Sequence, residues 1–170
     1  MTPSLASFWQ KKEHQRMIAL TLPMILANST APLIGLVDTA VLGHMSGEHF
    51  LAGAGIGGLI LTQIYWICGF LRMTCTGLSA QALGKGDHSQ AAKVVVQGGF
   101  VALLLALLIL IVQRPVFELG ATLADADSHV RSAMWDYFSV RVLGAPAVLI
   151  NLAMIGWLIG QQKTRQVMWI

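Results

Sequence analysis

Four long runs without a charged residue constrain this chain more than any other feature of its sequence. They lack Asp, Glu, Lys and Arg, and they cover residues 17–37, 49–71, 94–113 and 142–162. Each reaches the roughly 20 residues that a helix needs to cross the core of a bilayer. Because lipid offers the backbone no hydrogen-bond partners, a helix is the only economical structure for such runs. The sequence therefore predicts an all-α, polytopic membrane bundle.

We predict one partial transmembrane domain over residues 1–170. Residues 1–16 form a cytoplasmic tail, and residues 165–170 begin a fifth span. The predicted spans cover about 17–43, 50–75, 93–113 and 132–160. A signal peptide is a weaker interpretation of the first run, because it lacks a small-x-small exit and three more runs follow it.

The composition argues against a soluble enzyme or a nucleic-acid binder. Hydrophobic residues make up 55% of the chain and charged residues 11%, against roughly 25% charged in soluble domains. The net charge is +3, but the basic residues are scattered between apolar blocks and make no basic face. The chain has no nucleophile elbow, and residues 84–87 are too short for a phosphate-binding P-loop. We expect no enzyme activity, no cofactor and no nucleic-acid partner.

The cysteines and histidines give no persuasive metal site. Cys68 and Cys75 would lie about 10 Å apart along a helix at roughly 1.5 Å per residue, so a disulfide between them is implausible and packing is the expected role. His44, Glu48 and His49 lie close in sequence, but their spacing matches neither order of the zinc-protease motifs. We therefore expect no metal.

The charges that flank the runs predict the orientation. Eight basic residues fall on one side of the predicted membrane, and they are Lys11, Lys12, Arg16, Arg72, Lys85, Lys93, Lys163 and Arg165. Only two, Arg114 and Arg131, fall near the connections on the other side. Because cytoplasmic loops carry the excess of Lys and Arg, we predict an inner-membrane protein with a cytoplasmic amino-terminus.

Glycine and proline interrupt the runs. Gly53 with Gly57, and Gly156 with Gly160, form GxxxG pairs, which let two helix backbones approach closely. We interpret them as packing within one chain rather than as a homodimer interface. Pro146 marks a break in the fourth span, of the kind that neighbouring helices or water tolerate.

Asp38 is the most informative polar residue, because apolar sequence resumes at once after it. An ionisable residue inside a span is a functional-site hypothesis by default. Burial raises a carboxyl pKa, so such a group can gain and lose a proton near neutral pH. The alternative is that Asp38 lies at the outer interface and only caps a helix or faces water.

The fourth span carries a second polar set. At about 100° per residue, Tyr137, Arg141 and Asn151 fall within one stripe of a straight helix. Arg141 could instead have a structural role, by pairing with an acidic residue or by reaching the membrane interface. Asn151 could instead form a hydrogen bond between helices. For Asn28 in the first span, packing is the favoured interpretation from the residues alone.

Three ordered motifs resemble a known family. They read LPMILANSTAPLIGLVDTAVLGH in the first span, LRMTCTGLSAQALGKGD at the end of the second, and APAVLINLAMIGWLIGQQKTR in the fourth. Together they look like the amino-terminal part of a DinF-like member of the MATE family, the multidrug and toxic compound extrusion antiporters. The resemblance covers nearly all of the chain after its first dozen residues.

The resemblance implies a fold, a function and roles for residues. Members of that family have twelve helices in two lobes and exchange protons or sodium for small organic, often cationic, substrates. Asp38 matches the carboxylate proposed to bind the proton, and Pro23 lies near the proposed bend of the first helix. Asn151 matches a polar cavity position, Tyr137 matches more loosely, and Asn28 is the third cavity candidate.

The chain is short for that family. We expect a fragment of the antiporter, inactive alone unless another chain supplies the missing carboxy-terminal helices. Two alternatives stay open: a small four-helix multidrug antiporter that dimerises, and a membrane subunit that does not transport but binds a partner.

Labelling of single cysteines tests the predicted orientation. In a background without Cys68 and Cys75, a cysteine at Ser46 should react with an impermeant maleimide in intact cells, and one at Ser89 should not. The reason is that the first connection carries no basic residue, whereas the second does. The opposite labelling pattern would overturn the orientation.

Overall fold

The helices of this computed structural model follow one another without a strand in the part of the chain that it describes. That part is residues 48–167, together with the single positions 18, 21, 25, 29, 33, 36, 37, 40, 41, 43 and 44. The helices are α2 (Glu48–Ile67), α3 (Phe70–Gly84), α4 (His88–Leu123), α5 (Ser128–Val142), α6 (Ala145–Gly160) and α7 (Thr164–Val167). The predicted all-α class is confirmed. Three predicted site residues, Pro23, Asn28 and Asp38, lie outside the described residues.

Two of these helical lines are long and apolar enough to cross a membrane. They are His49–Gly84, which joins α2 and α3, and α4, each with 36 residues. Helices α5 and α6 qualify together as a third span, bent by 50°. Thirty-six residues extend about 54 Å at about 1.5 Å per residue, beyond the roughly 30 Å hydrocarbon core. Arg72, Lys93 and Arg114, which the sequence placed near connections, therefore lie within helices.

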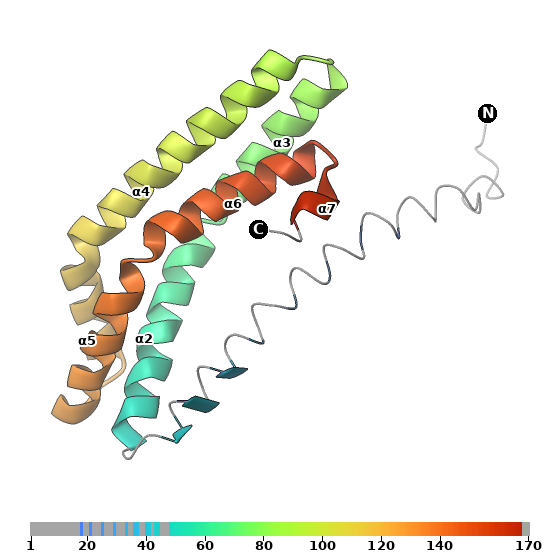
Figure 1. Cartoon of the computed structure of the whole chain (residues 1–170). Coiled ribbons are helices and arrows are strands. Elements are labelled where there is room, and N and C mark those ends of the chain that lie inside the picture. The colour runs from blue at the N-terminus through green and yellow to red at the C-terminus, as the bar shows by residue number, and fades with distance from the viewer. Residues whose placement is uncertain are drawn as a thin grey trace, which may run out of the picture.

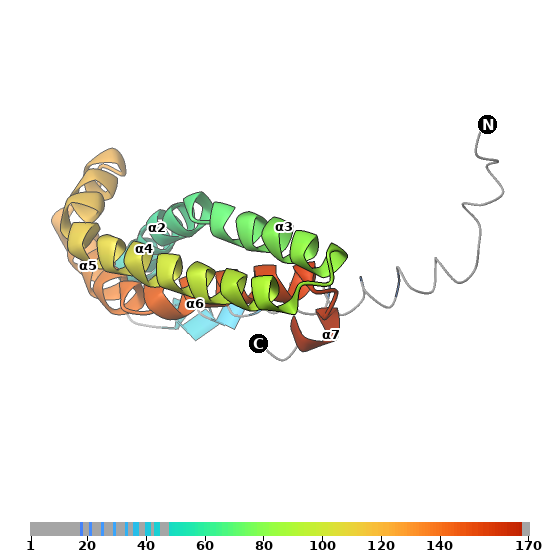
Figure 2. The ribbon, with the colours of Figure 1, turned by 90° about the horizontal axis from the view of Figure 1, so that it is seen from above.

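The bundle is elongated, with three helical lines side by side (Figure 1). Helix α2 packs mainly against α5, and α3 packs against α6 and α4. The lines α2–α3 and α5–α6 run in the same direction, and α4 runs back between their ends (Figures 1 and 2). The α2–α5 contact therefore holds one half of the bundle, and the α3–α6 contact holds the other.

The bend between α5 and α6 has a cause in the sequence. Pro146 has no N–H, so the carbonyl of Val142 loses the partner that a continuous helix would give it. The chain tightens there, and the amides of Leu143 and Gly144 bond back only three residues, to Val140 at 3.3 Å and Arg141 at 3.1 Å. The predicted break at Pro146 is confirmed.

The line formed by α2 and α3 has a milder interruption. The Gly69 amide donates to the Trp66 carbonyl at 3.0 Å, and the Leu71 amide donates to the Cys68 carbonyl at 3.0 Å. These bonds span three residues instead of four, which tightens the helix locally. The α5–α6 line therefore changes direction at its break, and the α2–α3 line tightens at its own.

The turns between the helices follow local chemistry. Gly86 has φ +68°, a left-handed conformation that glycine adopts at little cost, and it ends α3. Asp87 then caps α4 by accepting a hydrogen bond from the Gln90 amide at 2.9 Å. Asp127 caps α5 in the same way. The Val130 amide, and then the His129 amide, hold the pKa of the Asp127 carboxyl below its usual value.

Both GxxxG pairs lie at contacts between helices of this one chain. A Cβ at Gly53 would lie 2.7 Å from the Met134 amide nitrogen of α5. A Cβ at Gly156 would lie 2.5 Å from the Arg72 carbonyl oxygen, and one at Gly160 would lie 2.6 Å from that of Thr76. The prediction of close packing within the chain is confirmed.

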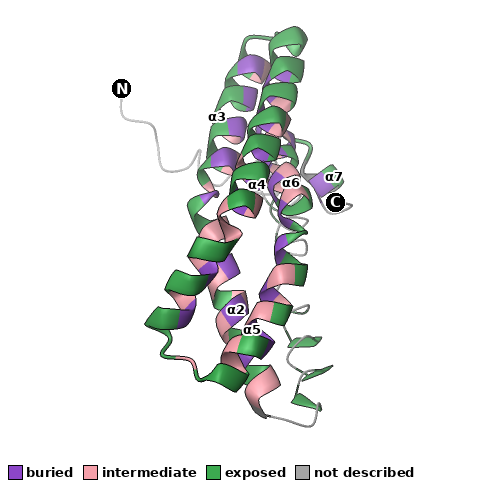
Figure 3. Cartoon of the chain, turned by 90° about the vertical axis from the view of Figure 1, so that its left-hand side faces the viewer, coloured by how far each residue is buried: buried purple, intermediate pink, exposed green. Residues whose placement is uncertain are grey.

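Buried residues lie where the helices face one another (Figure 3). The largest fully buried hydrophobic side chains are Leu61, Met134, Phe138, Val142 and Leu149. Large apolar side chains elsewhere are exposed, as expected for a surface that lipid covers. Cys68 and Cys75 are free and buried, in agreement with a packing role.

A buried polar cluster joins three helices at the α3–α4 end of the bundle. The Ser79 hydroxyl donates to the Trp157 carbonyl at 3.0 Å, and the Gln161 amide donates to the Ser79 hydroxyl oxygen at 2.9 Å. The Trp157 indole donates to the Ala91 carbonyl of α4 at 2.8 Å. These bonds fix α3, α4 and α6 relative to one another.

A larger side chain at Gly156 should separate α3 from α6. We expect Gly156→Val to destabilise the chain by about 1 to 3 kcal/mol, the usual cost of overpacking. Thermal unfolding in a mild detergent measures it. Gly99→Val is the matched control, since a Cβ at Gly99 meets nothing within 4 Å. Equal losses for the two variants would show that the contact at Gly156 adds no stability beyond helix propensity.

Candidate functional site

Tyr137 and Arg141 form a polar pair on α5 that faces α2. A Cβ at Gly57 would lie 3.3 Å from the Tyr137 ring, and one at Gly58 would lie 3.7 Å from it, so the ring fills the space that these glycines leave. The Arg141 guanidinium donates a hydrogen bond to the Tyr137 hydroxyl, and its carbon lies 5.3 Å from the ring centroid. The structure therefore brings together two of the residues in the predicted stripe.

Asn151 lies apart from this pair, beyond the bend. The predicted stripe assumed one straight helix, and the 50° bend between α5 and α6 limits that argument to α5. The Asn151 amide oxygen is buried, and no hydrogen-bond partner for it lies among the described residues. A buried acceptor without a partner is uncommon in proteins, which keeps Asn151 among the candidates.

Tyr65 of α2 is a second polar group of this kind. Its hydroxyl is buried and has no hydrogen-bond partner among the described residues. It lies near enough to Arg141 for the two groups to interact electrostatically. Tyr65 thus connects the polar pair on α5 with the space beside α2.

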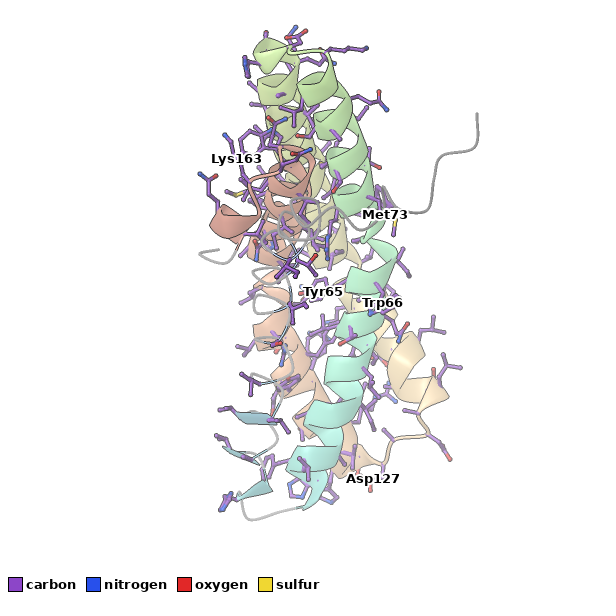
Figure 4. All side chains as sticks on the ribbon, turned by 90° about the vertical axis from the view of Figure 1, so that its right-hand side faces the viewer. Tyr65, Trp66, Met73, Asp127 and Lys163 are labelled. Carbon is purple, nitrogen blue, oxygen red and sulfur yellow. The ribbon has the colours of Figure 1, made fainter. Side chains whose placement is uncertain are left out.

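A groove of about 1030 Å³ runs along α2, α3 and α6, past the break between α2 and α3. Gly69, at the first break, lines it, and so does Val148, one turn into α6. Its other described lining residues are Thr62, Tyr65, Trp66, Phe70, Arg72, Met73, Thr76, Gly77, Leu152 and Ile159. Figure 4 places Tyr65, Trp66 and Met73 along the line of α2 and α3. Discontinuous helices line the binding sites of many transporters, where the breaks leave backbone polar groups available.

The charge in the groove is positive. Arg72 is the charged residue among those that line it, and no acidic residue occurs in the described lining. The Arg72 side chain makes no hydrogen bond or ion pair with the described residues, whereas Arg131 pairs with Glu118 between α5 and α4.

A separate group of ionisable residues lies at the opposite end of the bundle. The His49 and His129 rings have centroids 6.2 Å apart, beside the capping residue Asp127. Among the described residues, no group of three or more His, Cys, Asp and Glu is arranged to hold a metal ion. At this end, the described role of Asp127 is to cap α5.

Comparison with known proteins decides the family. The model of the MatE family matches residues 23–170. This chain belongs to the MatE family. Members of this family are membrane transporters rather than enzymes, and they need no cofactor.

The matching relatives are longer proteins. DNA damage-inducible protein F of Escherichia coli (strain K12) is 38% identical over 146 residues, which cover 86% of this chain and 32% of the relative. Multidrug resistance protein MdtK of Yersinia pestis (strain Pestoides F) is 33% identical over 153 residues, which cover 90% of this chain and 33% of that relative. The chain thus spans about a third of the length of these relatives. No solved structure matches the chain significantly.

Sequence reasoning missed two residues of the groove. Arg72 was counted only as an orientation signal, although it interrupts apolar sequence much as Asp38 does. Tyr65 lies inside an uncharged run, and nothing in the sequence distinguishes its hydroxyl from that of any tyrosine near an interface. Only the positions of α2, α3 and α6 bring both residues to one groove.

The two tyrosines should respond differently to loss of the hydroxyl. Tyr137→Phe keeps the ring against Gly57 and loses the bond from Arg141, so it should destabilise the chain by about 1.5 kcal/mol, the lower end for bonds to charged groups. Tyr65→Phe should leave the melting temperature unchanged or raise it, because it removes a buried hydroxyl without a described partner. Thermal unfolding in detergent compares them. A larger loss for Tyr65→Phe would contradict this assignment.

Proposed function

We propose that this chain supplies the amino-terminal helices of a proton-coupled multidrug efflux antiporter of the bacterial inner membrane. The observation that carries the proposal is the family match over residues 23–170. The relatives named as multidrug resistance proteins extend the proposal to multidrug efflux. Small organic molecules, often cations, are the proposed substrates.

In the proposed mechanism, Asp38 is the group that carries the proton. Burial in a span would raise its pKa toward neutrality, so it could bind a proton on one side of the membrane and release it on the other. Pro23 is the proposed bend of the first span. Carriers of this type move one repeat or bundle against another around a central site.

The cavity residues of this proposal are Asn28, Tyr137 and Asn151. Asn151 offers a buried acceptor without a described partner, and Tyr137 offers a ring and a hydroxyl already bonded to Arg141. We propose that further helices, on the same or another chain, complete the cavity.

Substitution of Asp38 tests the coupling. In a chain extended with the proposed further helices, Asp38→Asn should insert normally and lose proton-driven efflux down to background, because an amide cannot titrate. Asp38→Glu should retain part of the activity. The measurement is efflux of a fluorescent cation from vesicles with an imposed pH gradient, repeated with a sodium gradient to identify the coupling ion.

Asp136→Asn is the matched control, since Asp136 is an exposed carboxylate on α5. Undiminished efflux by Asp38→Asn at equal expression would remove Asp38 from the mechanism. The 170-residue chain alone is expected to insert without transporting. Gradient-dependent efflux by that chain, lost in Asp38→Asn, would instead favour the four-helix dimeric antiporter.

A further inference from the structure

The groove along α2, α3 and α6 combines an apolar wall with one isolated positive charge. Trp66 and Met73 on its rim are each 79% exposed, so the groove opens at the outer surface of the described bundle. Leu152 and Ile159 of α6 form the opposite wall. Such a wall favours a ligand with an apolar body.

Arg72 sets the charge of that ligand. An arginine side chain in or near a membrane is stable when it pairs with an anion or reaches the head groups. Within the described residues, Arg72 has no acidic partner, and no acidic side chain lines the groove. A guanidinium matches phosphate oxygens particularly well, because it can donate two parallel hydrogen bonds.

The part of the groove between Arg72 and Thr62 has about the length of one leaflet's acyl region. From Arg72 back to Thr62 the helix advances roughly 15 Å at about 1.5 Å per residue, which is half of the roughly 30 Å hydrocarbon core. Beyond Arg72, the same helical line continues to Gly84 and the turn at Lys85, where charged side chains reach water. An anion held at Arg72 would therefore leave about that length for an acyl chain along the groove.

We propose that this groove binds an anionic phospholipid, with its phosphate on the Arg72 guanidinium and an acyl chain lying along Trp66 toward Thr62. With the predicted cytoplasmic amino-terminus, the lipid comes from the cytoplasmic leaflet, which is the more anionic one. Basic pockets between membrane helices on that side bind anionic head groups in other proteins. This proposal does not depend on the proposed proton coupling at Asp38.

Lipid retention tests the proposal. The chain is reconstituted in nanodiscs of equal parts phosphatidylglycerol and phosphatidylcholine, extracted in mild detergent, and its retained lipids are counted by native mass spectrometry. One basic residue near the membrane surface corresponds to an enrichment of about fivefold. Wild type and Arg72→Lys should therefore retain phosphatidylglycerol about fivefold over phosphatidylcholine, and Arg72→Gln should retain both equally.

Two pairs of variants, Arg72→Gln with Lys85→Gln and Gly77→Leu with Gly84→Leu, test whether lipid binds in the groove or to any basic part of the surface. Lys85→Gln removes a positive charge outside the lining and should keep the preference. Gly77→Leu should fill the groove and reduce retention of both lipids, whereas Gly84→Leu should not; a Cβ at either glycine meets nothing within 4 Å. Equal retention of both lipids by wild type, a preference that survives Arg72→Gln, or an equal loss with Lys85→Gln would overturn the proposal.

Discussion

The close contact between α3 and α6 is the interaction on which the rest of the described structure depends. Lipid tails are as apolar as leucine, so helices in a membrane associate through tight packing and polar contacts rather than through the hydrophobic effect. At Gly156 and Gly160, the backbone of α3 occupies the space that side chains would take. Ser79 and Gln161 bond to each other only because the two helices approach this closely. The groove beside Arg72 exists between the same two helices.

The break between α2 and α3 and the bend between α5 and α6 determine where the α3–α6 contact ends. A straight α5–α6 helix could not follow α2 along one half of the bundle and α3 along the other. Pro146 removes a backbone donor, and the resulting 50° bend lets Met134 pack on Gly53 while Gly156 packs on Arg72. The bend therefore lets one helical line contact both α2 and α3.

Much of this architecture could be predicted from the sequence, and the omissions have physical reasons. Uncharged runs report the solvent around a helix, so they identified the membrane bundle, and GxxxG spacing identified the close contacts. Helix ends obey local capping instead. Asp87 caps the start of α4 and Asp127 caps the start of α5, and α4 extends beyond its apolar run at both ends. The polar stripe through Asn151 failed as a continuous feature because angular periodicity assumes a straight axis. The groove depends on the packing of α6 beside α2 and α3, which are distant from it in sequence, and no local pattern encodes it.

The positive charge of the described site limits how a cation could be carried. Arg141, which bonds to the proposed cavity residue Tyr137, would repel an organic cation held beside that residue. A transporter of cations that contains this chain therefore needs an ionised acid from another segment. Under the proposed function that acid is Asp38, whose protonation would cancel the attraction and leave only the repulsion by Arg141. Because coupling between two ligands is reciprocal, binding of the cation would then make protonation less favourable by the same free energy. Competition of this kind between proton and substrate for one charge is what an antiporter requires.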